Sequence, residues 1–254
     1  MDSASGCTIC RDGNDAPLEF SFAYQPIVHL GSRTIYAHEA LVRGPQGESA
    51  GSVLQRIDDA NRYRFDQACR VRAIEAACES GLRERDHERL SINFLPHAVY
   101  RPELCIQTTL QIARQRDLAI GNVIFEVTEG ERIEDGPWFA SILQEYKRQG
   151  FLTAIDDFGA GYAGLRLLAD FQPDLIKLDM DLVRNVDQLA ARQAIARAAI
   201  RLAEELGIDL VVEGVQSAGE RDFFVHEGVR LFQGYLFCEP RFRGLADAAR
   251  CLGA

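Results

Sequence analysis

From residue 90 onward, the chain alternates between short apolar segments and segments with helical spacing. Near-continuous apolar strands that alternate with helices are typical of a parallel sheet covered by those helices. The expected strands cover residues 90–95, 122–128, 151–155, 174–179, 209–213 and 229–236. The expected helices cover residues 103–116, 135–150, 165–170 and 188–206, with one from residue 217 and a last one near residue 245.

Two further strand-like segments precede this alternation, and no helix separates them. They cover residues 18–30 and 34–44, and helical spacing follows over residues 52–61 and 63–80, with Gly81 as a C-terminal cap. Neighbouring parallel strands need a long crossover connection, which the first two segments lack. One of these two strands is therefore expected to run antiparallel to the rest.

Eight strands in a chain of 254 residues favour one closed barrel. The predicted fold class is α/β, a modified (β/α)8 TIM-type barrel with one antiparallel strand. The barrel is expected to cover residues 18–254, after a polar N-terminal tail at residues 1–17. No repeat or internal domain boundary interrupts the pattern.

Composition narrows the classes of partner. No apolar run reaches the length of a membrane span and no secretory signal pattern opens the chain, so we expect a cytoplasmic protein without membrane contact. Seven cysteines without regular spacing favour reduced thiols over a disulfide framework. The formal charge of −10 argues against a nucleic-acid polymer as partner. An anionic ligand remains compatible with an acidic protein if metal ions supply positive charge.

Two adjacent aspartates, Asp156 and Asp157, follow the strand predicted at residues 151–155. Side chains of neighbouring strand residues point to opposite faces, so both carboxylates can serve one site only if the backbone bends. Gly159 and Gly161 would permit such a bend. The alternative is an ordinary turn with two solvated acids.

Polar residues also interrupt the other apolar strands, mostly near their C-terminal ends. The set comprises Glu39, Asn93, Glu126, Asp156 with Asp157, Lys177 with Asp179, Glu213 and Gln233. These strand ends converge on one face of a barrel, where barrel enzymes place their chemistry. Clustered carboxylates repel one another unless cations are bound, and oxygen ligands without a histidine cluster suit Mg²⁺ or Mn²⁺. A helix N-terminus could satisfy one or two such acids, but it explains a set spread over seven strands poorly.

These residues lie in motifs that resemble the EAL-domain cyclic di-GMP phosphodiesterases over about residues 18–240. The motifs are Gln25-Pro-Ile-Val, Glu39-Ala-Leu41-Val-Arg43, Ile92-Asn93, Glu126-Val-Thr-Glu129, Asp156-Asp-Phe-Gly, Lys177-Leu-Asp179, Glu213-Gly-Val and Gln233-Gly-Tyr. The amino-acid sequence of these segments is most similar to that of EAL domains coupled to blue-light sensors, although these 254 residues contain no such sensor.

The resemblance implies a role for each matching residue, with two Mg²⁺ or Mn²⁺ ions per site. The metal ligands would be Glu39, Asn93, Glu126, Asp156 and Asp157, with Asp156 shared by both ions. The catalytic residues would be Lys177, Glu213, Glu39 and Asp156. The substrate-binding residues would be Gln25, Leu41, Arg43, Asp179 and Gln233, and Glu129 would support the metal-binding loop.

The function implied by the resemblance is hydrolysis of cyclic di-GMP to linear pGpG by a water that two metal ions activate. A catalytically weak or inactive receptor for cyclic di-GMP, signalling through a protein partner, is the alternative. A protein-interaction module that needs no nucleotide is a third reading, which the intact ligand-binding residues disfavour. The turnover rate, the preferred metal, the upstream signal and the formation of a homodimer stay open.

Three features depart from the family pattern or fall outside it. Ala163-Gly164 stands where the family often has two serines, and Gln216 where it often has glutamate. Cys7 and Cys10 in the tail supply at most half of a zinc site, so a specific role and a plain solvated tail both remain open.

Overall fold

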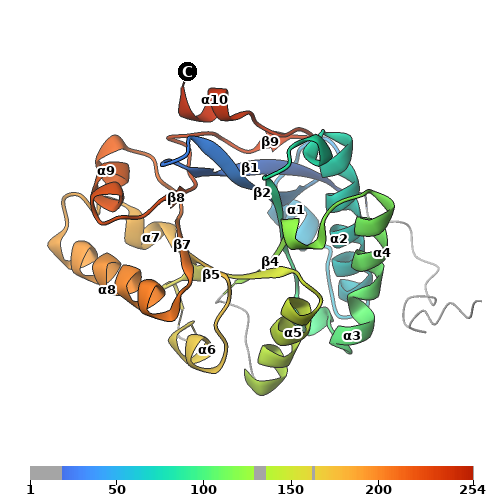
Figure 1. Cartoon of the computed structure of the whole chain (residues 1–254). Coiled ribbons are helices and arrows are strands. Elements are labelled where there is room, and N and C mark those ends of the chain that lie inside the picture. Colours follow the sequence, from blue (N-terminus) through green and yellow to red (C-terminus); the bar gives the residue numbers. More distant parts are fainter. Residues whose placement is uncertain (1–18, 129–135, 162–163, 254) are drawn as a thin grey trace, which may run out of the picture.

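The computed structural model describes residues 19–128, 136–161 and 164–253. Eight strands close into a barrel in the order β2-β3-β4-β5-β6-β7-β8-β1, with helices packed around the outside (Figure 1). The β1 strand pairs antiparallel with both β2 and β8, and the other neighbours in the barrel are parallel. The prediction of a modified barrel with one antiparallel strand is confirmed.

The strands are β1 Ser21–His29, β2 Thr34–Arg43, β3 Arg89–Asn93, β4 Val123–Thr128, β5 Leu152–Phe158, β6 Leu175–Leu178, β7 Asp209–Val212, β8 Leu231–Phe232 and β9 Arg241–Phe242, which pairs with β1. The helices are α1 Ala50–Leu54, α2 Arg62–Glu79, α3 Pro102–Cys105, α4 Gln107–Gln115, α5 Gly136–Arg148, α6 Gly164–Asp170, α7 Met180–Val183, α8 Ala190–Leu206, α9 Ala218–His226 and α10 Ala248–Leu252. Short 3₁₀ turns are η2 Leu82–Glu84, η3 Pro96–Ala98 and η4 Ile120–Asn122.

A layer of apolar side chains lies inside the barrel, each from a different strand. It consists of Ile27, Ala37, Ile124, Ala154, Leu175, Val211 and Leu231. A larger apolar cluster packs the helices against the outer face of the sheet. Because the interior layer is apolar, the polar residues farther along the same strands are gathered above it, at one end of the barrel.

Two helix ends follow the expected cap chemistry. Gly81 after α2 and Gly207 after α8 have φ of 91° and 68°, the left-handed region that ends a helix without a steric penalty for glycine.

Three predicted elements are shorter or divided in the structure. The helix predicted at 52–61 ends at Leu54, because the Asp58 carboxylate accepts hydrogen bonds from the backbone N–H groups of Ala60 and Asn61 and forms a turn instead. The helix predicted at 103–116 is divided into α3 and α4. The strand predicted at 229–236 is reduced to β8, after which Gly234 brings its backbone against Val215.

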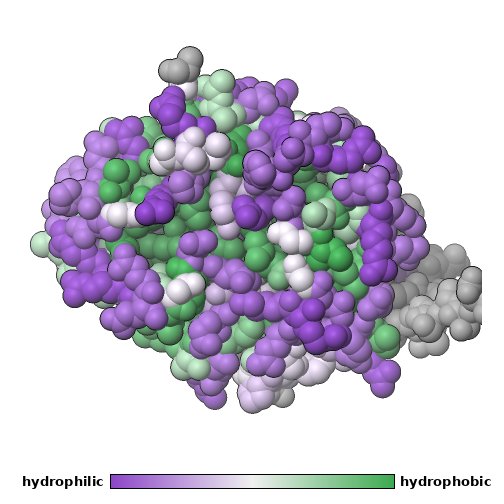
Figure 2. Space-filling model, in the orientation of Figure 1, coloured by the Kyte–Doolittle hydropathy of each residue, from purple (hydrophilic) through white to green (hydrophobic). Residues whose placement is uncertain are grey.

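The described surface is mostly polar. Figure 2 shows hydrophilic residues over most of the visible face, with hydrophobic residues in the hollows between the outer elements. Within the described ranges, no helix is long and apolar enough to cross a bilayer. The five described cysteines are free thiols, whereas Cys7, Cys10 and the rest of the predicted tail lie outside the described residues.

Candidate active site

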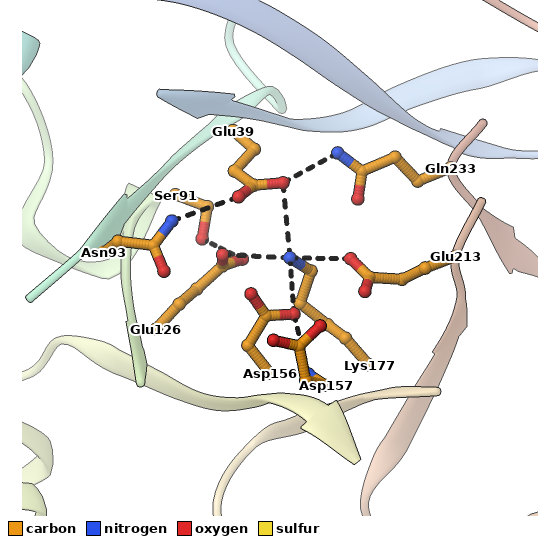
Figure 3. Close-up of polar contacts among 9 residues, drawn as sticks. All are labelled: Glu39, Ser91, Asn93, Glu126, Asp156, Asp157, Lys177, Glu213 and Gln233. Atoms are coloured by element: carbon orange, nitrogen blue, oxygen red, sulfur yellow. Dashed lines mark hydrogen bonds and ion pairs between the residues drawn. The ribbon is translucent and has the colours of Figure 1, made fainter. Parts of the chain in front are cut away.

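The polar residues singled out in the sequence converge at the C-terminal ends of the parallel strands (Figure 3). Five neighbouring strands from β2 to β6, together with the segments directly after β7 and β8, each contribute at least one side chain to the cluster. They are Glu39, Asn93, Glu126, Asp156 with Asp157, Lys177, Glu213 and Gln233. The convergence follows from the barrel, in which all parallel strands end on the same face.

Lys177 lies at the centre of this cluster and is 1% exposed. Its Nζ atom is 2.7 Å from Glu213 Oε1 and 3.0 Å from Asp156 Oδ1. The same atom is 3.0 Å from Glu126 Oε2 and 3.2 Å from Glu39 Oε2. One buried ammonium group therefore contacts four carboxylates from four strands or strand ends.

Neutral side chains form hydrogen bonds with Glu39 and Glu126 and orient their carboxylates. The Asn93 amide donates to Glu39 Oε1 at 3.0 Å, and the Gln233 amide donates to Glu39 Oε2 at 2.8 Å. The Ser91 hydroxyl donates to Glu126. Both oxygens of Glu39 are thus engaged, which fixes the orientation of its carboxylate.

The backbone bends at the paired aspartates, as the sequence requires if both serve one site. The register between β5 and β6 shifts between Ile155 and Phe158, and Asp157 has φ of 54°. The bend begins at Asp157 itself, and Gly159, with φ of 99°, continues it. As a result, Asp156 and Asp157 line the same cavity.

The electrostatics of the cluster show an excess of negative charge. Burial alone would lower the pKa of Lys177, but the surrounding carboxylates outweigh burial and raise that pKa well above its usual range. Burial and two neighbouring carboxylates raise the pKa of Glu126 to about 8, although Lys177 opposes the shift. Burial likewise raises the pKa of Glu213, and burial with Asp156 raises the pKa of Asp157 to about 6. One ammonium does not neutralise these carboxylates, so further cations would stabilise their charged forms.

The donor set fits divalent metal ions. Ligand atoms of Glu39, Glu126 and Asp156 lie within 4.8 Å of one another, and so do those of Asp156, Asp157 and Glu213. The two groups share Asp156, whose two oxygens could serve two ions. Carboxylate and amide oxygens are the ligands preferred by Mg²⁺ and Mn²⁺.

Two adjoining cavities lie at the cluster. One of about 310 Å³ is lined by Gln25, Gln233 and most of the carboxylates. The other, of about 280 Å³, is lined mostly by apolar side chains, among them Leu41, and also by Arg43 and Asn93. Asn93 of the second cavity donates a hydrogen bond to Glu39 of the first, so these two side chains link the linings of the two cavities.

Three further residues from the sequence analysis do not join this cluster among the described residues. Asp179 lines neither of these two cavities, and its Oδ1 atom caps α7 by accepting from the Asp181 backbone N–H at 2.9 Å. Glu129 and Ala163 lie outside the described residues.

Sequence reasoning assigned no site role to several residues that lie here, although it noted Gln216 as a departure from the family pattern and Tyr235 as part of the Gln233-Gly-Tyr motif. Ser91 lies two positions before Asn93 in β3, so strand alternation could have placed it on the same face. Gln216, Met180 and Tyr235 line the first cavity, and Tyr235 is 59% exposed. No strand pattern marks the last three, because they lie in loops or at a helix start.

The sequence matches known proteins over most of its length. The EAL domain family matches residues 14–240. The chain is 33% identical over 228 residues to the "Blue light- and temperature-regulated antirepressor BluF" of Escherichia coli, covering 90% of this chain and 56% of that protein. It is 28% identical to the "Cyclic di-GMP phosphodiesterase NbdA" of Pseudomonas aeruginosa, covering 85% of this chain and 28% of that protein. The chain therefore spans about half or less of the length of these curated relatives.

Solved structures share the same fold. A standalone versatile EAL protein from Vibrio cholerae, in its c-di-GMP bound form, superposes with a TM-score of 0.87 at 47% identity, covering 92% of this chain and 97% of that one. BlrP1 of Klebsiella pneumoniae, in a manganese/cy-diGMP complex, gives a TM-score of 0.83 at 36% identity, covering 92% of this chain and 59% of that one. With this fold, these motifs and the family match over residues 14–240, the chain belongs to the EAL domain family.

Proposed function

We propose that this chain is a metal-dependent phosphodiesterase that hydrolyses cyclic di-GMP to linear pGpG. The observation that carries the proposal is the presence of two clusters of candidate metal ligands beside a cavity. The two clusters share Asp156, and their carboxylates surround Lys177. Relatives named as cyclic di-GMP phosphodiesterases support the reaction, and solved neighbours with this nucleotide bound support the ligand. Cyclic di-GMP is anionic, so with a formal charge of −10 on the protein, bound divalent cations would supply the positive charge that holds it.

Two Mg²⁺ or Mn²⁺ ions would be held by the carboxylate groups. One ion would take Glu39, Asn93, Glu126 and Asp156, and the other Asp156 and Asp157. When bound, such ions supply positive charge to a phosphate and lower the pKa of water. The excess negative charge of the cluster is what fits this site to divalent cations.

The two adjoining cavities would hold the ligand across the barrel end. The Gln25 and Gln233 side chains line the first cavity, where amides can pair with the polar edge of a guanine. Arg43 lines the second cavity, where a guanidinium can bind a phosphate with two parallel hydrogen bonds. Leu41 adds apolar contact beside it.

Hydrolysis would add water to phosphorus and break its bond to the O3′ oxygen, which leaves as a hydroxyl after gaining a proton. Lys177 stays protonated, so it can donate a hydrogen bond to the water or to a phosphate oxygen but cannot accept the proton of the water. Glu213 lines the cavity 2.7 Å from Lys177 and offers a carboxylate oxygen that can accept that proton.

A nucleotide receptor without turnover is the second candidate, because one relative is named as an antirepressor. In that case the same cavities would bind cyclic di-GMP and a partner protein would respond to the bound state. The complete set of carboxylates favours the enzyme, since a receptor needs only the ligand-holding residues.

Incubation of the purified chain with cyclic di-GMP and Mn²⁺ or Mg²⁺, followed by chromatography, tests the proposal. We expect pGpG to accumulate with the intact chain and not with Asp156→Asn. Calorimetry with Ca²⁺ in place of Mn²⁺ should show binding of the nucleotide without turnover, since the larger ion prefers longer bonds and more ligands. Binding without any product in Mg²⁺ or Mn²⁺ would establish the receptor instead, and absence of both would refute both candidates.

A further inference from the structure

A buried ion pair lies in α2, outside the cluster of carboxylates. The Arg70 side chain is fully buried, and its Nη2 atom is 2.8 Å from Asp66 Oδ2. Its Nη1 atom donates to the Tyr146 hydroxyl of α5 at 2.7 Å. Burying an ion pair costs desolvation energy that often cancels its attraction, so such a pair is weak support for a role in stability alone.

Three aromatic rings surround the Arg70 guanidinium. Its central carbon is 5.1 Å from the ring centre of Phe125 and 5.4 Å from those of Phe94 and Tyr146. The Phe125 and Tyr146 rings are 4.8 Å apart, and Phe94 packs edge-on against Phe125 at 5.9 Å. A planar cation among ring faces holds the rings in fixed relative positions.

Two of these rings are the direct neighbours of candidate metal ligands. Phe94 follows Asn93 at the end of β3, and Phe125 precedes Glu126 in β4. Because strand side chains alternate, the phenylalanines face the helices while Asn93 and Glu126 face the site.

The backbone at these strand ends is tied to the same pair. Asp66 Oδ1 accepts a hydrogen bond from the Leu95 backbone N–H at 2.9 Å. The Phe94 backbone N–H donates to the Glu126 carbonyl at 3.0 Å. The ion pair thus contacts β3 and β4 just behind the two ligands, through rings on one side and through a backbone hydrogen bond on the other.

We propose that Arg70 is a positioning residue, whose guanidinium fixes Phe94 and Phe125 and thereby sets the places of Asn93 and Glu126 for metal binding. The proposal rests on the proposed function for the identity of the ions. Groups that orient metal ligands from behind typically change metal affinity or activity by ~10–100-fold when removed. We expect Arg70 to act in that range.

The double variant Asp66→Asn/Arg70→Met tests this role. It removes both charges together, so no unpaired charge is left buried, and the amide oxygen can still accept from the Leu95 N–H. We expect the affinity for Mn²⁺, measured by calorimetry without nucleotide, to fall ~10–100-fold. Hydrolysis should require correspondingly more Mn²⁺ and should recover at saturating Mn²⁺, while the thermal midpoint stays within a few degrees.

Arg72→Met is the matched control. Arg72 lies on the same helix with its guanidinium 4.4 Å from the ring centre of Phe20, which adjoins no candidate metal ligand. This variant should leave Mn²⁺ affinity unchanged. Tyr146→Phe keeps the ring and removes only the hydroxyl that accepts from Arg70, so it should lower Mn²⁺ affinity by a smaller factor.

A folded double variant with unchanged Mn²⁺ affinity would overturn the proposal, and so would an equal loss in Arg72→Met. If the double variant does not fold, wild-type Mn²⁺ affinity in Tyr146→Phe overturns it. Failure of the parent chain to bind Mn²⁺ would instead refute the proposed function, so the two failures can be told apart.

Discussion

Replacing Asp156 by asparagine removes the carboxylate that both groups of candidate metal ligands share. Asparagine keeps the shape of the side chain but loses its charge and one ligand oxygen. Asp157→Asn is the matched comparison, because Asp157 is the next residue, lines the same cavity and belongs to only one of the two groups.

The size of the effect follows from the charges. One unit charge about 4 Å from another is worth ~4 kcal/mol at an effective dielectric constant of ~20. That energy is a ~10³-fold change in a binding constant, and it is a lower limit here because the proposed ions are divalent. Asp156→Asn would lose this attraction for both ions. The substitution also leaves Lys177 with three of its four carboxylate partners. Asp157→Asn would lose it for one ion only. Burial, together with repulsion from Asp156, already raises the pKa of Asp157 to about 6, so this substitution also relieves an unfavourable charge.

Initial rates of cyclic di-GMP hydrolysis across a Mn²⁺ titration measure the difference. We expect Asp156→Asn to lower the rate by ~10³-fold or more, with little recovery at high Mn²⁺. Asp157→Asn should regain a large part of its activity as Mn²⁺ rises. Circular dichroism should show the native fold in both variants. Equal recovery of the two would refute the shared role of Asp156.

Three further predictions address the ligands, the fold and the tail. Asn93→Ala and Glu126→Ala should each abolish turnover while thermal unfolding stays cooperative, and near-normal rates at limiting Mn²⁺ in either variant would contradict the site. Glu220→Gln should lower the free energy of unfolding by ~1–3 kcal/mol near pH 7, because the carboxylate accepts three backbone hydrogen bonds. Burial raises the pKa of Glu220, but these hydrogen bonds outweigh it and leave the pKa below its usual range. The contribution is therefore present above about pH 4.3 and is lost as pH falls through the lowered pKa, so urea unfolding of the two proteins should converge in acid. Deleting residues 1–15 should leave hydrolysis within a few-fold, and loss of stoichiometric zinc with the tail would show that it has a specific role.

The barrel was predictable because its signal is periodic. Apolar strands and helical spacing alternate along the chain, and the missing helix between the first two strands indicated that one of them is antiparallel, which the structure shows to be β1. The polar strand ends were predictable for the same reason, since the fold itself brings them to one face.

The remaining features depend on side-chain geometry, which periodicity does not encode. The contact of Lys177 with four carboxylates depends on side-chain length and rotamer. Arg70 gives no sign of burial in the sequence, because arginine on a helix is usually exposed. The left-handed backbone at Asp157 is similarly hidden, since glycine is the residue that normally marks such a conformation.

The inverted strand β1 has a consequence for how the domain can be joined to others. It pairs with β8 and with β9, so the first strand of the barrel lies beside the last strands (Figure 1). A unit whose ends are adjacent can be inserted into a longer chain without stretching its scaffold. The two curated relatives described above are longer proteins, and this chain spans 56% and 28% of their lengths. Gln25 lies on β1 and lines the first cavity, so the strand at which the barrel closes also contributes to the candidate ligand site.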